Sequence, residues 1–212
     1  KNVATEIRKL VNPEFKIKDK DFLTELIKRL AEKNILVFEF VETWNKKDRA
    51  NIDGFFLKPN VIVLKRQQIS FKREIFTLAH ELGHYLLNEE EIDQIDYQDF
   101  INQKLSRIET WCNDFAFHFL SGEFEKIIET IDNSTAHNDY NIDLIQSISE
   151  KTHLSRIAIF TKLLLLNKIS PANYNKVKAG FEENFRIKNE ELKKKRELDK
   201  QNGINPGGST PI

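Results

Sequence analysis

The stretch FTLAHELGHYLL, residues 76–87, does most to restrict the folds open to this chain. Apolar residues recur through it at intervals of three and four, and the pattern extends back to Phe71. We therefore predict one helix over residues 71–87, with Ser70 as its N-cap. Because most of the helix circumference is apolar, the helix is expected to be buried, and other elements must be built around it.

Two histidines and a glutamate interrupt this apolar helix. His80 and His84 are four residues apart, so they project from one face about 6 Å apart, a separation at which two imidazoles can bind one Zn²⁺. Glu81 lies about 100° round the helix, where its carboxylate could take a proton from a metal-bound water. The pattern H-E-x-x-H also arises by chance, but unpaired polar groups are costly in an apolar helix. Gly83 leaves one side open for a substrate or strand to approach closely.

A catalytic zinc site needs a third protein ligand and one open position. The candidate is Glu109 in SRIETWCNDFAFHFL, which shares a helix face with Asn113 because the two are four residues apart. Asn113 could accept the second N–H of a ligand histidine and so fix the orientation of its ring. Cys112 is interpreted as a small buried hydrophobe, since a fourth protein ligand would close the open position.

The rest of the chain predicts an α+β fold that is mostly helical. An amphipathic helix at 19–33 precedes short strands at about 35–41, 55–58 and 61–65, which we expect to form a small N-terminal antiparallel sheet. A long helical pattern runs from about residue 100 to 131, with a bend at Ser121-Gly122. Two helices joined near 153–155 and a further one after Pro171 follow. The predicted parts are a core at 1–125, a C-terminal helical subdomain at 126–198 and a flexible tail at 199–212.

Composition restricts where such a protein works. Lys+Arg and Asp+Glu both number 33, so no net charge draws the chain to nucleic acid or to an anionic membrane. Cys112 is the only cysteine, and no apolar run approaches the ~18 residues of a membrane span. We expect a cytoplasmic protein without a membrane segment. Because the sequence starts at Lys1 and contains no methionine, we also expect it to be a fragment of a longer protein.

Together these segments resemble the ImmA/IrrE-type metallopeptidases. REIFTLAHELGHYLL is similar to their H-E-x-x-H helix, IETWCNDFAFHFL to their E-x-x-x-N helix, and IDGFFLKPNVIVLK to the hairpin before the first of these helices. The resemblance implies a zincin-like metallopeptidase core over residues 1–125. It also implies one Zn²⁺ per chain held by His80, His84 and Glu109, with Glu81 as catalytic base and Asn113 behind the ligands.

The family resemblance further implies a regulatory endopeptidase that cuts a partner protein at a specific site. Such enzymes act in transcription regulation, stress response or toxin–antitoxin settings, so a helix-turn-helix repressor or an antitoxin is the expected substrate. The chain departs from the family where many members read LLMP after the E-x-x-x-N helix and this one reads FLSGEF. That segment could shape the substrate cleft.

Other functions stay open. The segment IQSISEKTHLSRIAIFTKLLLLNKIS has the spacing of a helix-turn-helix with its turn at Thr152–Leu154, so Arg156 and Lys162 could meet DNA. The chain would then be a DNA-binding or partner-binding regulator with a structural or sensory metal. A pseudo-enzyme is a further alternative, although a purely structural zinc site has no use for Glu81.

The sequence also leaves open which residue would stabilise an oxyanion during the reaction. His118 is rejected because it lies nine residues past Glu109, about 900° round the helix and so on the opposite face. The remaining candidates are Tyr85, Tyr97, His137 and His153. The acidic segment 89–99 could block the site until a partner moves it.

Overall fold

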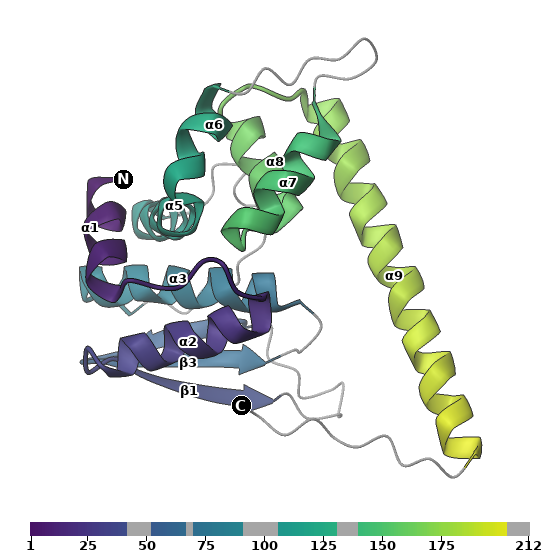
Figure 1. Cartoon of the computed structure of the whole chain (residues 1–212), viewed down its shortest axis with the longest axis horizontal. Coiled ribbons are helices and arrows are strands. Elements are labelled where there is room, and N and C mark those ends of the chain that lie inside the picture. Colours follow the sequence, from purple (N-terminus) through teal and green to yellow (C-terminus); the bar gives the residue numbers. More distant parts are fainter. Residues whose placement is uncertain (42–51, 67–69, 91–105, 131–139, 203–212) are drawn as a thin grey trace. The chain divides into compact units, whose positions relative to one another are not determined.

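The computed structural model describes residues 1–41, 52–66, 70–90, 106–130 and 140–202 (Figure 1). Its backbone contacts divide the chain into two compact units, residues 1–131 with 142–159, and residues 132–141 with 160–212. The domain boundaries after residues 125 and 198 stay a prediction. No described helix combines the length and apolarity that a membrane crossing requires.

The first unit is a small sheet with helices. Its elements are α1 (Asn2–Val11), α2 (Asp19–Ala31), β1 (Leu36–Val41), β2 (Gly54–Leu57), β3 (Val61–Arg66), α3 (Phe71–Leu87), α5 (Arg107–Ser121), the 3₁₀ turn η2 (Gly122–Phe124), α6 (Glu125–Thr130) and α7 (Ile142–Thr152). The mostly helical α+β class is therefore confirmed. The predicted bend falls where α5 gives way to η2, because Gly122 has a positive φ of 57°, which favours glycine.

The sheet has the order β1-β3-β2 and is mixed. β2 and β3 are antiparallel, as expected for strands joined by the short turn at 58–60. β1 and β3 are parallel, so the prediction of a wholly antiparallel sheet is wrong for this pair. The reason is length: residues 42–60 separate β1 from β3, enough chain for the crossover that a parallel pair requires.

The core lies between the sheet and its helices. α2 packs against β1 and α3 against β2 and β3, and the two helices contact each other, so they cover one face of the sheet (Figure 1). Phe56, Ile62 and Leu64 are fully buried beneath them, whereas Leu36 and Phe38 face outward and are exposed. Burial of the apolar face is what fixes the register of such a sheet.

Helix α3 is the central element of the first unit. It runs over residues 71–87 as predicted, and every residue from Glu74 to His84 is buried. Ser70 is its N-cap, but the Ser70 side chain makes no capping hydrogen bond. The sheet lies on one side of α3 and α5 packs along it, which explains the apolar circumference.

The helices of the C-terminal part are α8 (Arg156–Leu165), which spans the boundary of the units, and α9 (Pro171–Gln201). α9 starts at Pro171, a residue favoured in the first helical turn. Its first turns are anchored in the second unit, where the Tyr174 and Thr161 hydroxyls lie 3.1 Å apart. Further along, Phe185, Ile187 and Leu198 are exposed.

Candidate metal centre

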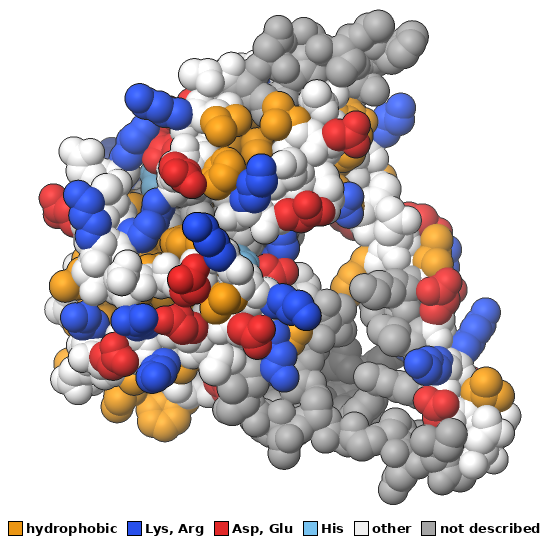
Figure 2. Space-filling model, in the orientation of Figure 1, with side chains coloured by type: hydrophobic (Ala, Val, Ile, Leu, Met, Phe, Trp, Pro, Cys, Tyr) orange, Lys and Arg blue, Asp and Glu red, His pale blue; other side chains and the backbone are white. Residues whose placement is uncertain are grey.

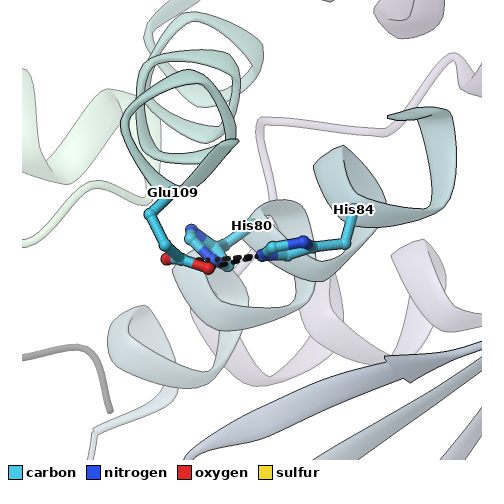
Figure 3. A group of neighbouring side chains, drawn as sticks. All are labelled: His80, His84 and Glu109. Atoms are coloured by element: carbon cyan, nitrogen blue, oxygen red, sulfur yellow. Dashed lines mark hydrogen bonds and ion pairs between the residues drawn. The ribbon is translucent and has the colours of Figure 1, made fainter. Parts of the chain in front are cut away.

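Helix α3 presents two imidazoles side by side in the core. His80 and His84 are both 1% exposed, and their Nε2 atoms lie 3.1 Å apart (Figure 3). The four-residue spacing places both rings on the face of α3 that meets α5.

Helix α5 brings a carboxylate to the same point. The Ser106 hydroxyl caps α5 by accepting the Glu109 backbone N–H at 3.1 Å, which fixes the first turn that carries Glu109. The Glu109 carboxylate lies 3.2 Å from His80 Nε2 and 2.9 Å from His84 Nε2 (Figure 3). The candidate ligand atoms of all three residues lie within 4.8 Å of one another.

The close approach of α3 and α5 depends on Gly83. A Cβ at Gly83 would lie 3.1 Å from the Cα, Cβ and Sγ of Cys112. The open side of α3 therefore receives α5, not a strand or a substrate, so that prediction for Gly83 is wrong. Cys112 is completely buried at this contact, as expected for a small hydrophobe.

Asn113 orients the ring of the first histidine. Its Oδ1 lies 2.9 Å from His80 Nδ1, and a carboxamide oxygen can only accept a hydrogen bond. His80 Nδ1 therefore carries a proton, and Nε2 is the ring nitrogen that faces the cluster. Among the described residues the Asn113 amide nitrogen has no hydrogen-bond partner.

Glu81 is buried beside the cluster, at 4% exposure. Burial raises the pKa of Glu81 to about 7, while the histidine charges and a hydrogen bond from the Phe56 backbone act in the opposite direction. In the described part of the chain its Oε2 has no hydrogen-bond partner. A carboxylate with a pKa near neutrality and a free oxygen is suited to accept and return a proton.

Glu109 is held in its ionised form. Burial alone would raise the pKa of Glu109, but hydrogen bonds and charges from His80 and His84 lower it to about 2. Burial likewise opposes the charge on His84, yet Glu109 and Glu81 raise the pKa of that ring. The carboxylate of Glu109 is thus ionised, as a metal ligand must be.

These three side chains fit a zinc ion. Ligand atoms that bind Zn²⁺ tetrahedrally at about 2.0–2.1 Å are about 3.3 Å from one another. The observed separations of 3.1, 3.2 and 2.9 Å are close to that value. Two imidazole nitrogens and one carboxylate oxygen would leave a fourth position on the ion for water or substrate.

Three of the other side chains considered for the site have contacts in the structure. His118, which was rejected, is 3.1 Å from Glu125 Oε1. Tyr85 packs edge-on against Phe56. His153 contacts Asp19 at 2.6 Å and stacks on Phe22, so it joins α2 to the end of α7. Tyr97 and His137 lie outside the described residues, as does the acidic segment beyond residue 90.

Two backbone features escaped the sequence analysis. Gly54 is the first residue of β2 and lies against α3, a contact that the strand pattern at 55–58 does not predict. The Phe56 amide, which reaches Glu81, has no sequence signature of its own. The only sequence signal for this contact is Gly54, a glycine two residues before the buried Phe56.

The segment with helix-turn-helix spacing does form two helices, and the turn between them lies where it was predicted. α7 ends at Thr152, His153 adopts a positive φ of 56°, and α8 begins at Arg156. From residue 156 to 164, however, every α8 residue is buried or half-buried. A recognition helix needs an exposed face to enter the major groove.

A model of the family Peptidase M78, described as the IrrE N-terminal-like domain, matches residues 30–159, more than half of the chain. No curated protein matches the sequence significantly. One solved structure that it resembles is a Mycobacterium tuberculosis transcriptional regulator, with 15% sequence identity and a TM-score of 0.44. The match covers 76% of this chain and 46% of that chain, so this sequence spans less than half of the regulator's length.

Proposed function

This chain belongs to the Peptidase M78 family of IrrE N-terminal-like domains, and on that premise we propose that it is a zinc-dependent endopeptidase. The family points to a metallopeptidase or an IrrE-type regulator. Our proposal is the narrower one, that the chain cleaves a partner protein at a specific site and thereby regulates transcription. The expected substrate is a helix-turn-helix repressor or an antitoxin.

The observation that carries the proposal is the convergence of four buried side chains from two helices. His80, His84 and Glu109 bring their ligand atoms within 4.8 Å of one another, and Glu81 lies next to them with an oxygen that no described residue hydrogen-bonds. A purely structural zinc site is usually closed by four protein ligands and has no use for such a carboxylate. This arrangement therefore favours hydrolysis over a role in folding alone.

In the proposed mechanism, His80, His84 and Glu109 hold the metal and Asn113 keeps the His80 ring in its tautomer. A zinc ion bound there would supply Lewis-acid activation of the scissile carbonyl and of water. Glu81 takes a proton from the attacking water and returns it to the leaving amine. Burial raises the pKa of the Glu81 carboxyl above its ordinary value, which favours a group that has to accept a proton before it returns one.

The decisive variant is Glu81→Gln, which keeps the size of the side chain and removes its basicity. Zinc-loaded protein is incubated with the repressor encoded nearest to its gene, and cleavage is followed by gel electrophoresis and mass spectrometry. We expect the wild type to cut at one position. Glu81→Gln should keep zinc and fold but lose at least roughly a hundredfold in rate. The matched control is Glu123→Gln, at an exposed glutamate of η2, which should cleave normally.

Cleavage by Glu81→Gln at the wild-type rate would contradict this mechanism. If the wild-type protein leaves the repressor uncleaved, that repressor is not its substrate.

A further inference from the structure

Strand β2 lies at one edge of the described sheet. One backbone hydrogen bond is enough to show which of its N–H groups point toward β3 and which point away from it. Lys65 N–H donates to the Asp53 carbonyl at 2.9 Å, so Asp53 and Lys65 form a bonded pair. Along an antiparallel ladder, hydrogen-bonded pairs alternate with pairs whose backbone groups do not bond each other. Phe56 is three residues from Asp53 and opposite Ile62, and its N–H therefore points away from β3, toward the open edge.

The same strand lies unusually close to α3 at Gly54. A Cβ built on Gly54 would be 2.8 Å from Thr77 Cγ2 and 3.3 Å from Glu81 Cγ. It would also lie 3.1 Å from the Val63 carbonyl oxygen. Gly54 has no positive φ, so the glycine is required here for space and not for backbone conformation.

The two features meet at one carboxylate. Glu81 is buried, its Oε2 is unpartnered among the described residues, and the Phe56 backbone hydrogen-bonds the carboxylate. The Glu81 side chain has several rotatable bonds, and a proton-transfer group must be held in place to be efficient. An amide in a hydrogen-bonded strand is a rigid donor for this purpose.

We propose that β2 positions the Glu81 carboxylate beside the metal centre, with the Phe56 amide as the holding group and Gly54 as the positioning residue that sets the strand-to-helix distance. The inference rests on the proposed function, because it takes Glu81 as the proton-transfer group. It adds that the hairpin before α3 is part of the active machinery, although it supplies no side chain to the metal.

The test compares Gly54→Ala with four other variants. Thr77→Ser removes Cγ2, the atom that the new Cβ would strike first, and is made alone and together with Gly54→Ala. Gly180→Ala in α9 is the control, because a Cβ there meets nothing within 4 Å. Each zinc-loaded protein is assayed for bound zinc and for affinity toward acetohydroxamic acid by calorimetry. This small zinc chelator presents a hydroxyl to a neighbouring carboxylate, and Glu81→Ala serves as the reference for loss of that contact.

We expect Gly54→Ala to keep its zinc and to bind acetohydroxamate roughly tenfold more weakly, close to Glu81→Ala, because one hydrogen bond to a charged group is misplaced. The double variant should regain most of the affinity, and Thr77→Ser alone and Gly180→Ala should match the wild type.

Unchanged affinity in Gly54→Ala would overturn the proposal. The proposal would also be overturned if Gly54→Ala lost its zinc or its fold and the double variant with Thr77→Ser did not recover them. Gly54 would then be required for folding and not for the position of the Glu81 carboxylate. The readout needs no protein substrate. A wild type that binds acetohydroxamate in a Glu81-dependent way but cleaves no repressor would refute the proposed function alone.

Discussion

At the scale of single residues, the hydrogen bond between Asn113 and His80 decides which ring nitrogen faces the candidate metal centre. The amide oxygen 2.9 Å from Nδ1 keeps the Nε2 lone pair free for a cation. Glu109 and Glu81 are both buried glutamates, yet one is held ionised by two histidines while the other has a pKa of about 7. Burial raises the pKa of Glu81, whereas hydrogen bonds from the two imidazoles outweigh burial at Glu109 and lower its pKa.

Asn113→Leu tests the orienting contact. Leucine has a similar size but accepts no hydrogen bond, so the His80 ring loses its fixed tautomer. We expect zinc affinity to fall by about 10–100-fold, measured by competition with a chromogenic chelator. Asn113→Asp retains an acceptor and should bind zinc at least as well as the wild type. Equal zinc affinity in the leucine variant would show that the contact does not orient the ring.

At the scale of helices and strands, an ion-pair cluster joins the start of α3 to two strands of the sheet. Arg66 at the end of β3 pairs with Glu74 at 2.9 Å and with Glu39 of β1. Arg66 and Glu74 are each 3% exposed, so neither charge is solvated. Removing one partner leaves an uncompensated buried charge.

Arg66→Ala should therefore destabilise the fold by about 3–5 kcal/mol, measured by urea denaturation. Arg186→Ala is the matched control, since Arg186 also pairs with two glutamates but is 60% exposed, and such a change costs about 1 kcal/mol or less. Similar losses in both variants would mean that the Arg66 cluster contributes no more than a surface pair.

Helix α8 allows a prediction about nucleic acid. No residue from 156 to 164 is exposed, and Figure 2 shows basic and acidic side chains mixed over the visible face. We expect no binding to an operator duplex in fluorescence anisotropy at low ionic strength, where phosphate contacts are strongest. Affinity that weakens steeply with added salt would restore the DNA-binding alternative.

Periodicity predicted most of the elements, because it reports which face of a helix or strand is buried. The α3 bounds, the α5 interruption at Gly122 and the α7–α8 turn follow from residues visible in the sequence. The parallel pairing of β1 with β3 could not be predicted, because alternation does not encode strand direction. The α5 contact at Gly83 was also missed, since a glycine signals close approach but not the element that approaches. α1 was not predicted.

At the scale of the whole molecule, the cluster of His80, His84 and Glu109 connects two helices that are separate in sequence. α3 and α5 are connected through residues 88–106, and the cluster joins them through the core. Because a metal that binds only the folded state stabilises it, zinc should raise the thermal midpoint.

Zinc at a hundredfold excess over its Kd should add roughly 2.7 kcal/mol, which corresponds to an increase of several degrees in Tm. The measurement compares thermal melts in zinc and in EDTA. His84→Ala should show no difference between the two melts. An equal zinc-dependent shift in that variant would place the stabilising metal elsewhere.

The central claim is that His80, His84 and Glu109 hold one zinc ion, and elemental analysis of purified protein tests it most directly. The wild type should contain one zinc per chain. His80→Ala and Glu109→Ala should contain far less, while the control Glu123→Gln keeps the wild-type content. Stoichiometric zinc in both of the first two variants would contradict the site assignment.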